Sequence, residues 1–238
     1  MSMKVFGKIA GWLGKILLVF LIYSVGLTLI YRVMPVPFTP LMGIRLVEQA
    51  LDEEKVIKLH KKWTPIEEIS QHMVQAVVAA EDQKFVDHFG FDTEAIQKAL
   101  EGNKAGKNLK GGSTISNQTA KNVFLWPGRN YFRKGLEAYF TLLIEIFWSK
   151  ERIMEVYLNV IETGEGIYGV EAAAQTFYNK RAENLSRKEA AMIAAVLPNP
   201  RRWSPTKPTT YNYQRQSWIL RNMGNLHPVD FGKKDLSR

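Results

Sequence analysis

The first feature of the hydrophobic pattern is an uncharged run near the N-terminus, at residues 16–31. With Val33 and Met34 behind it and a glycine-containing apolar stretch in front, the run reaches the ~20 residues needed to cross a bilayer. We therefore expect an uncleaved transmembrane signal anchor at 16–34, preceded by a cytoplasmic N-terminus at 1–15.

The residues that flank the run indicate how it is oriented in the membrane and whether it is cleaved. Lys4, Lys8 and Lys15 lie on the N-terminal side, which favours a cytoplasmic N-terminus. The bias is modest, because Arg32 and Arg45 lie on the other side. A cleaved signal peptide is the alternative, with a shorter apolar core and a small-x-small cleavage site. The sequence Tyr-Arg-Val-Met-Pro follows instead, which favours the anchor.

Beyond the anchor, apolar residues recur at helical spacing. Thr64–Glu67 has the form of a capping box with proline at the first helical position, and it predicts a helix that carries apolar residues as far as Ala80. Ser186–Glu189 has the form of a second capping box, and it opens an alanine-rich helix that Pro198 ends.

Two further helices are predicted from their ends. Ser149 can cap one of them, and Thr209–Met223 is expected to form the last helix, closed by Gly224. Alternating patterns are nearly absent, and Lys55–Leu59 is the one weak candidate for a strand. The chain is therefore predicted to be mainly α-helical, with one large domain at 63–238.

Prolines mark the segment between the anchor and this domain. Pro35, Pro37 and Pro40 predict a stiff, non-helical exit from the membrane, within a linker and membrane-proximal segment at 35–62. The domain that follows is long enough to bury a core of its own.

The composition excludes several kinds of chemistry. The chain has 238 residues and no cysteine, so it forms no disulfide, no thiolate nucleophile and no cysteine-based zinc site. Its formal net charge of +9 fits nucleic acid, anionic lipid or a phosphorylated substrate equally well. The excess is too diffuse to choose among these partners, and solvated surface lysines are the simplest explanation.

Glu81 is the first candidate for chemistry. It follows the apolar run Ala76–Ala80, where partial burial would raise its pKa and make it a better base near neutral pH. Taken alone, a helix-terminal glutamate paired with a lysine is the commoner case. We expect Asp82 to hydrogen-bond the turn that follows and Asp92 to cap a helix. His88 is expected to be a structural hydrogen-bonding residue, because no metal-ligand spacing accompanies it.

A second candidate segment begins at Gly111–Thr114 and is expected to continue as a helix through Asn122. Paired glycines let a ligand approach the backbone closely, and the free N–H groups at the start of a helix attract anions. Gln118 and Lys121 follow three residues apart, so they share a face of the helix.

The next predicted helix carries two cations beside a carboxylate. Arg133 and Lys134 precede Glu137 by four and three residues, which places all of them on one side. An ordinary helical salt bridge is the simplest explanation, and a carboxylate among phosphate-binding cations is the other. Between the two helices lies the apolar segment Val123–Pro127, which either dips into the membrane face or plugs into the core.

Together these motifs resemble the peptidoglycan glycosyltransferases of glycosyltransferase family 51, in their monofunctional form. The blocks that agree in order are Glu81–Asp92, Gly111–Asn122, Arg133–Ala138, Ser149–Tyr178 and, more loosely, Arg187–Pro200. The resemblance covers essentially the whole body and the anchor. One departure is Asn117, where the family usually has a glutamine; the shorter amide is expected to weaken a contact without removing the chemistry.

The resemblance implies a lysozyme-like helical head and a smaller membrane-proximal lobe, preceded by one N-terminal transmembrane helix. It implies an enzyme that polymerises lipid II into β(1→4) glycan strands by inverting glycosyl transfer and releases undecaprenyl diphosphate. Glu81 would be the general base and Glu137 the second catalytic carboxylate. The residues implied to bind substrate are Ser113, Thr114, Gln118, Lys121, Asn122, Arg133 and Lys134. Those implied to support the site are Asp82, Phe85, His88, Gly90 and Asn159.

The resemblance also bears on cofactors, partners and location. It is compatible with a divalent cation, Mg²⁺ or Mn²⁺, at Glu81 or Glu137, and with no other cofactor. The expected partners are lipid II, the growing glycan strand, the membrane, and proteins of cell-wall synthesis or division, without nucleic acid. The expected location is the bacterial cytoplasmic (inner) membrane, with a single span and the catalytic domain on the periplasmic or extracellular face.

Two other functions fit part of the sequence. A membrane-bound, lysozyme-like muramidase or lytic transglycosylase would also need a glutamate that emerges from a helix. Such a hydrolase has no use for Lys121, Arg133 and Lys134 gathered near two carboxylates. A non-catalytic cell-wall scaffold would not need the motif residues to be intact.

Overall fold

The computed structural model describes residues 3–104, 112–128 and 130–232. The chain divides into two compact units, Met1–Pro35 and Val36–Arg238, and each is described by itself. Gly111, the first residue of the predicted glycine pair, lies outside the described residues.

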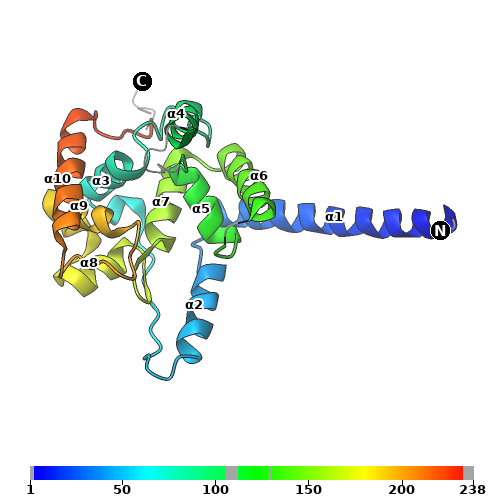
Figure 1. Ribbon diagram of the computed structural model, residues 1–238, viewed down its shortest axis with the longest axis horizontal. Helices are drawn as coiled ribbons and strands as arrows, with labels where there is room; N and C mark the ends of the chain where they lie inside the picture. Colours follow the sequence, from blue (N-terminus) through cyan, green and yellow to red (C-terminus); the bar gives the residue numbers. More distant parts are fainter. Residues whose placement is uncertain (1–2, 105–111, 129, 233–238) are drawn as a thin grey trace. The chain divides into compact units, whose positions relative to one another are not determined.

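The first unit is built on the helix α1 (Met3–Tyr31), drawn in blue in Figure 1. Its part Gly11–Tyr31 is long and apolar enough to cross a membrane, and it is the one such helix among the described residues. An α-helix satisfies its backbone hydrogen bonds internally, which a membrane span requires. The prediction of one apolar N-terminal helix is confirmed.

The second unit begins with a helix that the sequence did not predict, α2 (Pro40–Ala50). Pro40 was expected to belong to a non-helical exit, but it is the first residue of α2. A proline fits this position because the first N–H of a helix has no partner to lose. The side chain of Thr39 caps the helix by accepting a hydrogen bond from the backbone N–H of Met42 at 3.4 Å.

Three helices pack together to form one half of the core: α3 (Gln71–Glu81), α9 (Arg187–Val196) and α10 (Thr210–Asn225). They lie side by side in Figure 1. The capping box predicted at Ser186 is confirmed, since its hydroxyl and the Glu189 carboxylate each accept a backbone N–H. Gly224 was expected to close the last helix, but it lies within α10, which ends after Asn225.

The capping box predicted at Thr64 is wrong. A short 3₁₀ helix, η1 (Ile66–Glu68), follows Pro65 without a side-chain cap, and α3 begins only after Ser70, which caps it. The backbone of Thr64 has another partner. Its N–H donates to the side-chain oxygen of Asn159, and its carbonyl accepts from the Asn159 amide, both at 2.8 Å.

The other helices of the second unit are α4 (Thr93–Lys104), α5 (Ile115–Phe124), α6 (Tyr131–Phe147), α7 (Lys150–Val160), α8 (Val170–Tyr178) and the 3₁₀ helix η2 (Ala182–Asn184). Helix α5 packs against α6 and α7. Asp92 and Ser149 cap α4 and α7, as predicted. The helix predicted from Thr114 through Asn122 is confirmed and continues for two more residues.

A small sheet completes this unit: β1 (His60–Lys61), β2 (Glu162–Gly164) and β3 (Ile167–Tyr168), in the order β1-β3-β2. Strand β1 runs parallel to β3, and β2 runs antiparallel to it. The strand predicted at Lys55–Leu59 is wrong, because pairing begins one residue later. Strands of two or three residues are too short to show the alternation on which a sequence prediction rests.

We expect Asn159→Ala to destabilise the fold. Asn159 is buried, and its side chain satisfies both backbone polar groups of Thr64 and the carbonyl of Glu155. Truncation would leave buried polar groups without partners, at a cost of about 2–4 kcal/mol in the free energy of unfolding. Chemical denaturation of the full chain measures the loss. Asn184→Ala, at an exposed position, is the control and should change stability by less than about 0.5 kcal/mol.

Candidate active site

A cavity of about 520 Å³ lies where α5 and α6 face α2 and the segment after α7. Every residue predicted to bind substrate lines it except Thr114, and Glu137 lines it as well. The sequence therefore predicted much of one wall of this cavity. The other wall includes Arg45 and Glu162, which the sequence analysis did not single out.

The α6 side of the cavity holds a buried carboxylate between two cations. Glu137 accepts a hydrogen bond from Arg133 at 2.7 Å and another from Lys134. The predicted salt bridge is thus present, and it lies inside the cavity. Glu137 and Arg133 are buried, whereas Lys134 is largely exposed. The Glu137 carboxylate holds both cations in place. Its single negative charge cancels only one of their two positive charges, so this side of the cavity stays positive.

Two nitrogen groups in this wall have unused hydrogen-bonding capacity. Lys121 forms no ion pair with any residue in the described part of the chain. Burial lowers its pKa, while Glu137 raises that pKa and Arg133 and Lys134 lower it further. The Nε of Arg133 is buried and has no hydrogen-bond partner among the described residues. A partly desolvated ammonium and a buried N–H without an acceptor are both unfavourable, so this wall favours an anion that brings oxygen acceptors.

Glu81 lies at the end of α3, beside the cavity rather than in its lining. Its Oε2 accepts a hydrogen bond from the Gln118 amide at 2.9 Å, and its Oε1 lies 3.1 Å from a guanidinium nitrogen of Arg215. Burial raises the pKa of Glu81, while Gln118, Arg215 and Lys121 act to lower it. Since Gln118 and Lys121 line the cavity, the carboxylate and the cations belong to one site.

Two residues that hold Glu81 and Gln118 in place were missed. Arg215 belongs to α10, far along the chain, and no local pattern in the sequence distinguishes it from Arg221 of the same helix, which is exposed. Tyr157, on α7, is fully buried and donates its hydroxyl toward the Gln118 oxygen at 3.4 Å. Burial raises the pKa of Tyr157 well above its usual range, so the hydroxyl stays protonated. The tyrosine thereby orients the Gln118 amide with its nitrogen toward Glu81.

Asp82 connects the end of α3 to the beginning of α5. Its carboxylate lies 2.9 and 3.0 Å from Nε2 of His88 and accepts the backbone N–H of Ile115 at 3.0 Å. A carboxylate at a helix N-terminus is favoured by the helix dipole. The hydrogen-bonding roles predicted for Asp82 and His88 are therefore seen, and together they hold α5 against Glu81.

Gly90 and Thr114 strengthen this connection. The hydroxyl of Thr114 donates to the carbonyl of Gly90 at 2.7 Å, which explains why Thr114 is turned away from the cavity. Gly90 has a φ of 76°, and a Cβ there would lie 2.8 Å from a methyl carbon of Thr141. Phe85 is fully buried, with the ammonium of Lys150 4.8 Å from its ring centroid.

Asn117 is the position where the chain departs from the glutamine of the family pattern, and its contacts show what the shorter amide does. Its side-chain oxygen accepts the backbone N–H of Thr114 at 3.2 Å, and its nitrogen donates to the hydroxyl of Thr141 at 3.0 Å. The amide is therefore used inside the protein as a helix cap. A capping box commonly has Glu or Gln at this third helical position, and the shorter amide of Asn117 makes the same bond to the helix start.

The apolar segment between α5 and α6 divides between two environments. Val123 and Leu125 are buried in the core, and Val123 and Phe124 still belong to α5. Trp126 lines the cavity and is 39% exposed. The core alternative is thus correct for the first half of the segment.

The residues described here do not form a metal site by themselves. No group of three or more histidine, aspartate or glutamate side chains in the described part of the chain is arranged to hold an ion. Glu81 and Glu137 are each already bonded to a cationic side chain. A divalent cation at either residue would have to take most of its oxygen ligands from a bound diphosphate.

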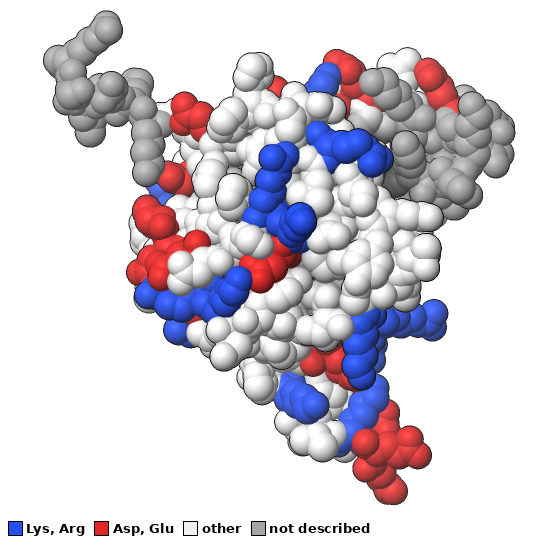
Figure 2. All heavy atoms as spheres, turned by 90° about the vertical axis from the view of Figure 1, so that its left-hand side faces the viewer, with Lys and Arg blue, Asp and Glu red and all other residues white. Residues whose placement is uncertain are grey.

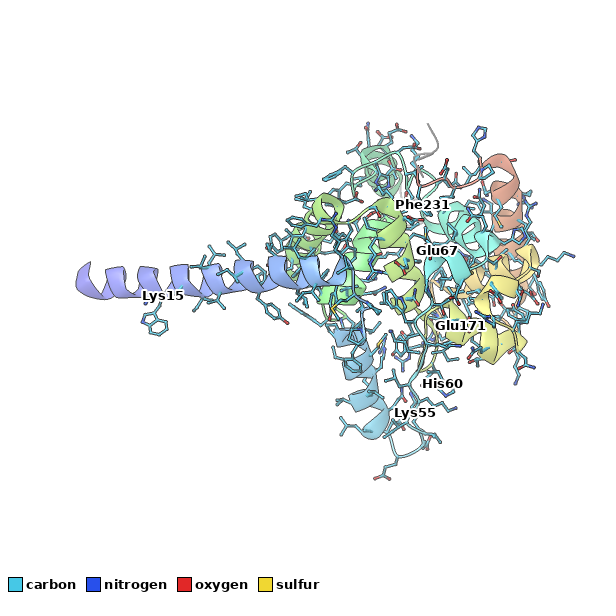
Figure 3. All side chains as sticks on the ribbon, turned by 180° about the vertical axis from the view of Figure 1, so that it is seen from behind. Lys15, Lys55, His60, Glu67, Glu171 and Phe231 are labelled. Carbon is cyan, nitrogen blue, oxygen red and sulfur yellow. The ribbon has the colours of Figure 1, made fainter. Side chains whose placement is uncertain are left out.

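A second hollow, of about 460 Å³, contains none of the predicted site residues. It is lined by residues of η1, α7 and the segment after α10, including Glu67 and Phe231, which are labelled in Figure 3. Figure 2 shows one face of the molecule, on which the basic side chains lie in small groups, several of them beside acidic ones.

The fold and the cavity define a helical enzyme domain with a cationic binding site beside the half-buried Glu81. Residues 48–224 match the family described as Transglycosylase. The chain belongs to this transglycosylase family, whose domain is lysozyme-like.

Named relatives match over nearly the whole chain. A protein of Bdellovibrio bacteriovorus called biosynthetic peptidoglycan transglycosylase is 54% identical over 217 residues, which cover 91% of this chain and 86% of that protein. A protein of the same name from Pseudomonas fluorescens is 51% identical over 217 residues, covering 91% and 90%. Another from Pseudomonas putida is 50% identical over 214 residues, covering 90% of each chain. The resemblance predicted from the motifs is confirmed.

We expect Arg215→Gln to raise the pKa of Glu81. The variant removes the guanidinium that favours the ionised carboxylate and leaves the burial that opposes it. A carbon-13 NMR titration of labelled glutamate side chains, with the Glu81 signal assigned from Glu81→Gln, measures the change. Arg221→Gln on the same helix is the matched control, since Arg221 is exposed, and it should leave the titration unchanged. An unaltered Glu81 titration in Arg215→Gln would contradict the assignment of this contact.

Proposed function

We propose that this transglycosylase uses the cavity to polymerise lipid II, a disaccharide-pentapeptide carried on undecaprenyl diphosphate. The growing glycan is the donor and one lipid II molecule is the acceptor. The acceptor's 4-hydroxyl attacks the anomeric carbon of the donor, which inverts its α configuration and forms a β(1→4) linkage. Undecaprenyl diphosphate leaves with the electron pair of the broken bond.

The observation that carries this proposal is the unused hydrogen-bonding capacity of Lys121 and Arg133 in one cavity. Among the described residues, the half-buried ammonium of Lys121 has no ion-pair partner and the buried Nε–H of Arg133 has no acceptor, and both suit a diphosphate, which supplies several anionic oxygens. These groups are already in place before substrate binds, so they can stabilise the charge that develops on the leaving group. Glu137 holds Arg133 and Lys134 in position and keeps the wall from excessive positive charge.

Glu81 is proposed to accept the proton of the attacking hydroxyl. A base is effective when its pKa lies near the working pH, and burial moves the pKa of Glu81 in that direction. Arg215 and Gln118 stabilise the ionised carboxylate and so limit the rise of its pKa. Because Glu81 must be deprotonated to work, activity should fall as the pH drops through a pKa that lies above that of an ordinary glutamate.

The same wall argues against a hydrolase. A muramidase needs an acid and a second carboxylate beside a neutral glycosidic bond. It gains nothing from Lys121, Arg133 and Lys134, whose combined charge would bind a diphosphate. A scaffold would have no need to keep Glu81 half-buried between an arginine and an amide.

A divalent cation remains a proposal. Since the side chains of the described residues do not form a metal site by themselves, the ion would enter with the diphosphate and depend on it for ligands. Polymerisation measured with a chelator, and again after addition of Mg²⁺ or Mn²⁺, decides whether the reaction uses one.

The helix α1 is proposed to anchor the enzyme in the cytoplasmic (inner) membrane by a single span. The lysines before its apolar part support a cytoplasmic N-terminus, which would put the catalytic domain on the periplasmic or extracellular face. The anchor would confine the enzyme to the layer that holds its lipid-linked substrate. Proteins of cell-wall synthesis or division are proposed as further partners.

We expect Glu81→Gln to reduce polymerisation of lipid II by about a hundredfold or more, because the reaction loses its general base. The amide keeps the shape of the side chain, so thermal melting should show a folded protein. Glu183→Gln, at an exposed position, serves as the control and should retain full activity. Wild-type rates in Glu81→Gln would place the base elsewhere or revive the scaffold hypothesis.

We expect Lys121→Met to reduce the rate of polymerisation by at least about tenfold without unfolding the protein. The variant removes a cation from the diphosphate wall, and it also removes the cost of burying that cation. The melting temperature should therefore stay the same or rise. Lys188→Met, at an exposed position, should leave both quantities unchanged. Loss of folding in Lys121→Met would instead show that the lysine is structural.

A further inference from the structure

A second polar pair lines the catalytic cavity, away from the residues assigned to the diphosphate. Arg45 comes from α2, and Glu162 is the first residue of β2. The Nε of Arg45 lies 3.7 Å from Oε1 of Glu162, which is too far for a hydrogen bond. Both atoms are buried, and neither has a hydrogen-bond partner among the described residues. The wall thus offers one free donor and one free acceptor, side by side.

The other contacts of these residues leave the two atoms free. The terminal nitrogen of Arg45 bonds Glu48 at 2.6 Å, which holds the guanidinium but does not involve its Nε. Glu162 is only 8% exposed, and burial raises its pKa while Arg45 and Arg201 lower it. Arg201 lies 3.6 Å from Glu48. Two arginines and two glutamates therefore lie together on this side of the cavity, so their charges balance. The wall around Glu137 has an excess of positive charge instead.

The spacing and the balance of charge limit what can bind. A prenyl chain would leave both buried polar atoms without partners, at a cost for each of them. A phosphate would be repelled by the Glu162 carboxylate. The N–H and C=O of one trans amide point in opposite directions and could reach only one of the two atoms. A single hydroxyl oxygen can lie about 2.8 Å from both atoms, donating to one and accepting from the other.

We infer that Arg45 and Glu162 bind one sugar hydroxyl of the glycan that occupies the cavity. The hydroxyl donates to Oε1 of Glu162 and accepts from the Nε–H of Arg45. Leu41, Ile161 and Leu197 line the cavity as well and supply apolar surface for the carbon face of a sugar ring. This inference rests on the proposed function, because it takes the occupant of the cavity to be a glycan linked to diphosphate.

The pair has no part in the proposed proton transfer or in stabilising the diphosphate, so its contact is expected to form in the bound substrate and to persist in the transition state. An interaction of this kind changes KM and leaves kcat nearly constant. Arg45 and Glu162 are thus positioning residues that select for a hydroxylated ligand.

The test uses the full chain in detergent and two soluble probes, a peptide-free tetrasaccharide of alternating N-acetylglucosamine and N-acetylmuramic acid, and inorganic pyrophosphate. Calorimetry measures the Kd of each probe. Glu162→Met should weaken tetrasaccharide binding about tenfold and leave pyrophosphate binding unchanged. Glu162→Gln, which retains an acceptor without the charge, should fall between wild type and Glu162→Met. Lys121→Met should show the opposite pattern, with pyrophosphate binding weakened and tetrasaccharide binding retained.

Two further variants control for charge and for folding. Glu165→Met removes a nearby carboxylate whose partner is Lys55, labelled in Figure 3, at 3.0 Å, and it should affect neither probe. Arg45→Lys keeps the charge but removes the Nε donor, so it should weaken tetrasaccharide binding even if Glu162→Met proves unstable in a melting experiment.

Three results would overturn the inference: no tetrasaccharide binding by the wild type, wild-type binding in Glu162→Met and Arg45→Lys, or an equal loss of both probes in them. Failure of the proposed function would look different. In that case the wild type would not polymerise lipid II, whereas the effects of Glu162 and Arg45 on tetrasaccharide binding would remain measurable.

Discussion

The attachment of α5 to the end of α3 is the interaction on which the site depends. A helix N-terminus exposes backbone N–H groups that need acceptors, and Asp82 meets one of them by bonding Ile115. Asp82 directly follows Glu81, so the same contact brings α5 beside the proposed base. Gln118, one turn along α5, then reaches Glu81, and Lys121, another turn along, faces the cavity. A structural hydrogen bond and the geometry of one helix thus determine the distance between base and cations.

The two sides of the cavity differ in their electrostatic character. On the side of α5 and α6, Arg133 and Lys134 bond the Glu137 carboxylate while Lys121 keeps its charge unpaired among the described residues, which leaves positive charge for a diphosphate. On the α2 side, Arg45 and Glu162 lie in a balanced group and leave neutral hydrogen-bonding capacity. A substrate that is anionic at one place and hydroxylated at another fits both sides. Neither side needs a nucleophile, which agrees with transfer in a single displacement.

Much of this site could be predicted from the sequence because its residues are close together along helices. Arg133, Lys134 and Glu137 share a helix face by spacing alone, and Gln118 and Lys121 do so on α5. Arg215 and Glu162 could not be found this way, since they reach the site only through the packing of α10 and through a strand of three residues. Local signals also failed at Thr64 and Gly224. There, a contact with Asn159 and the continued packing of α10 outweighed the intrinsic preference of the residues for helix ends.

The contact between Arg215 and Glu81 joins the last helix of the domain to one of its first. Neither helix contributes a residue to the lining of the cavity, yet their packing places the guanidinium on the carboxylate. A substitution that shifts α10 against α3 would therefore alter the proposed base from outside the cavity.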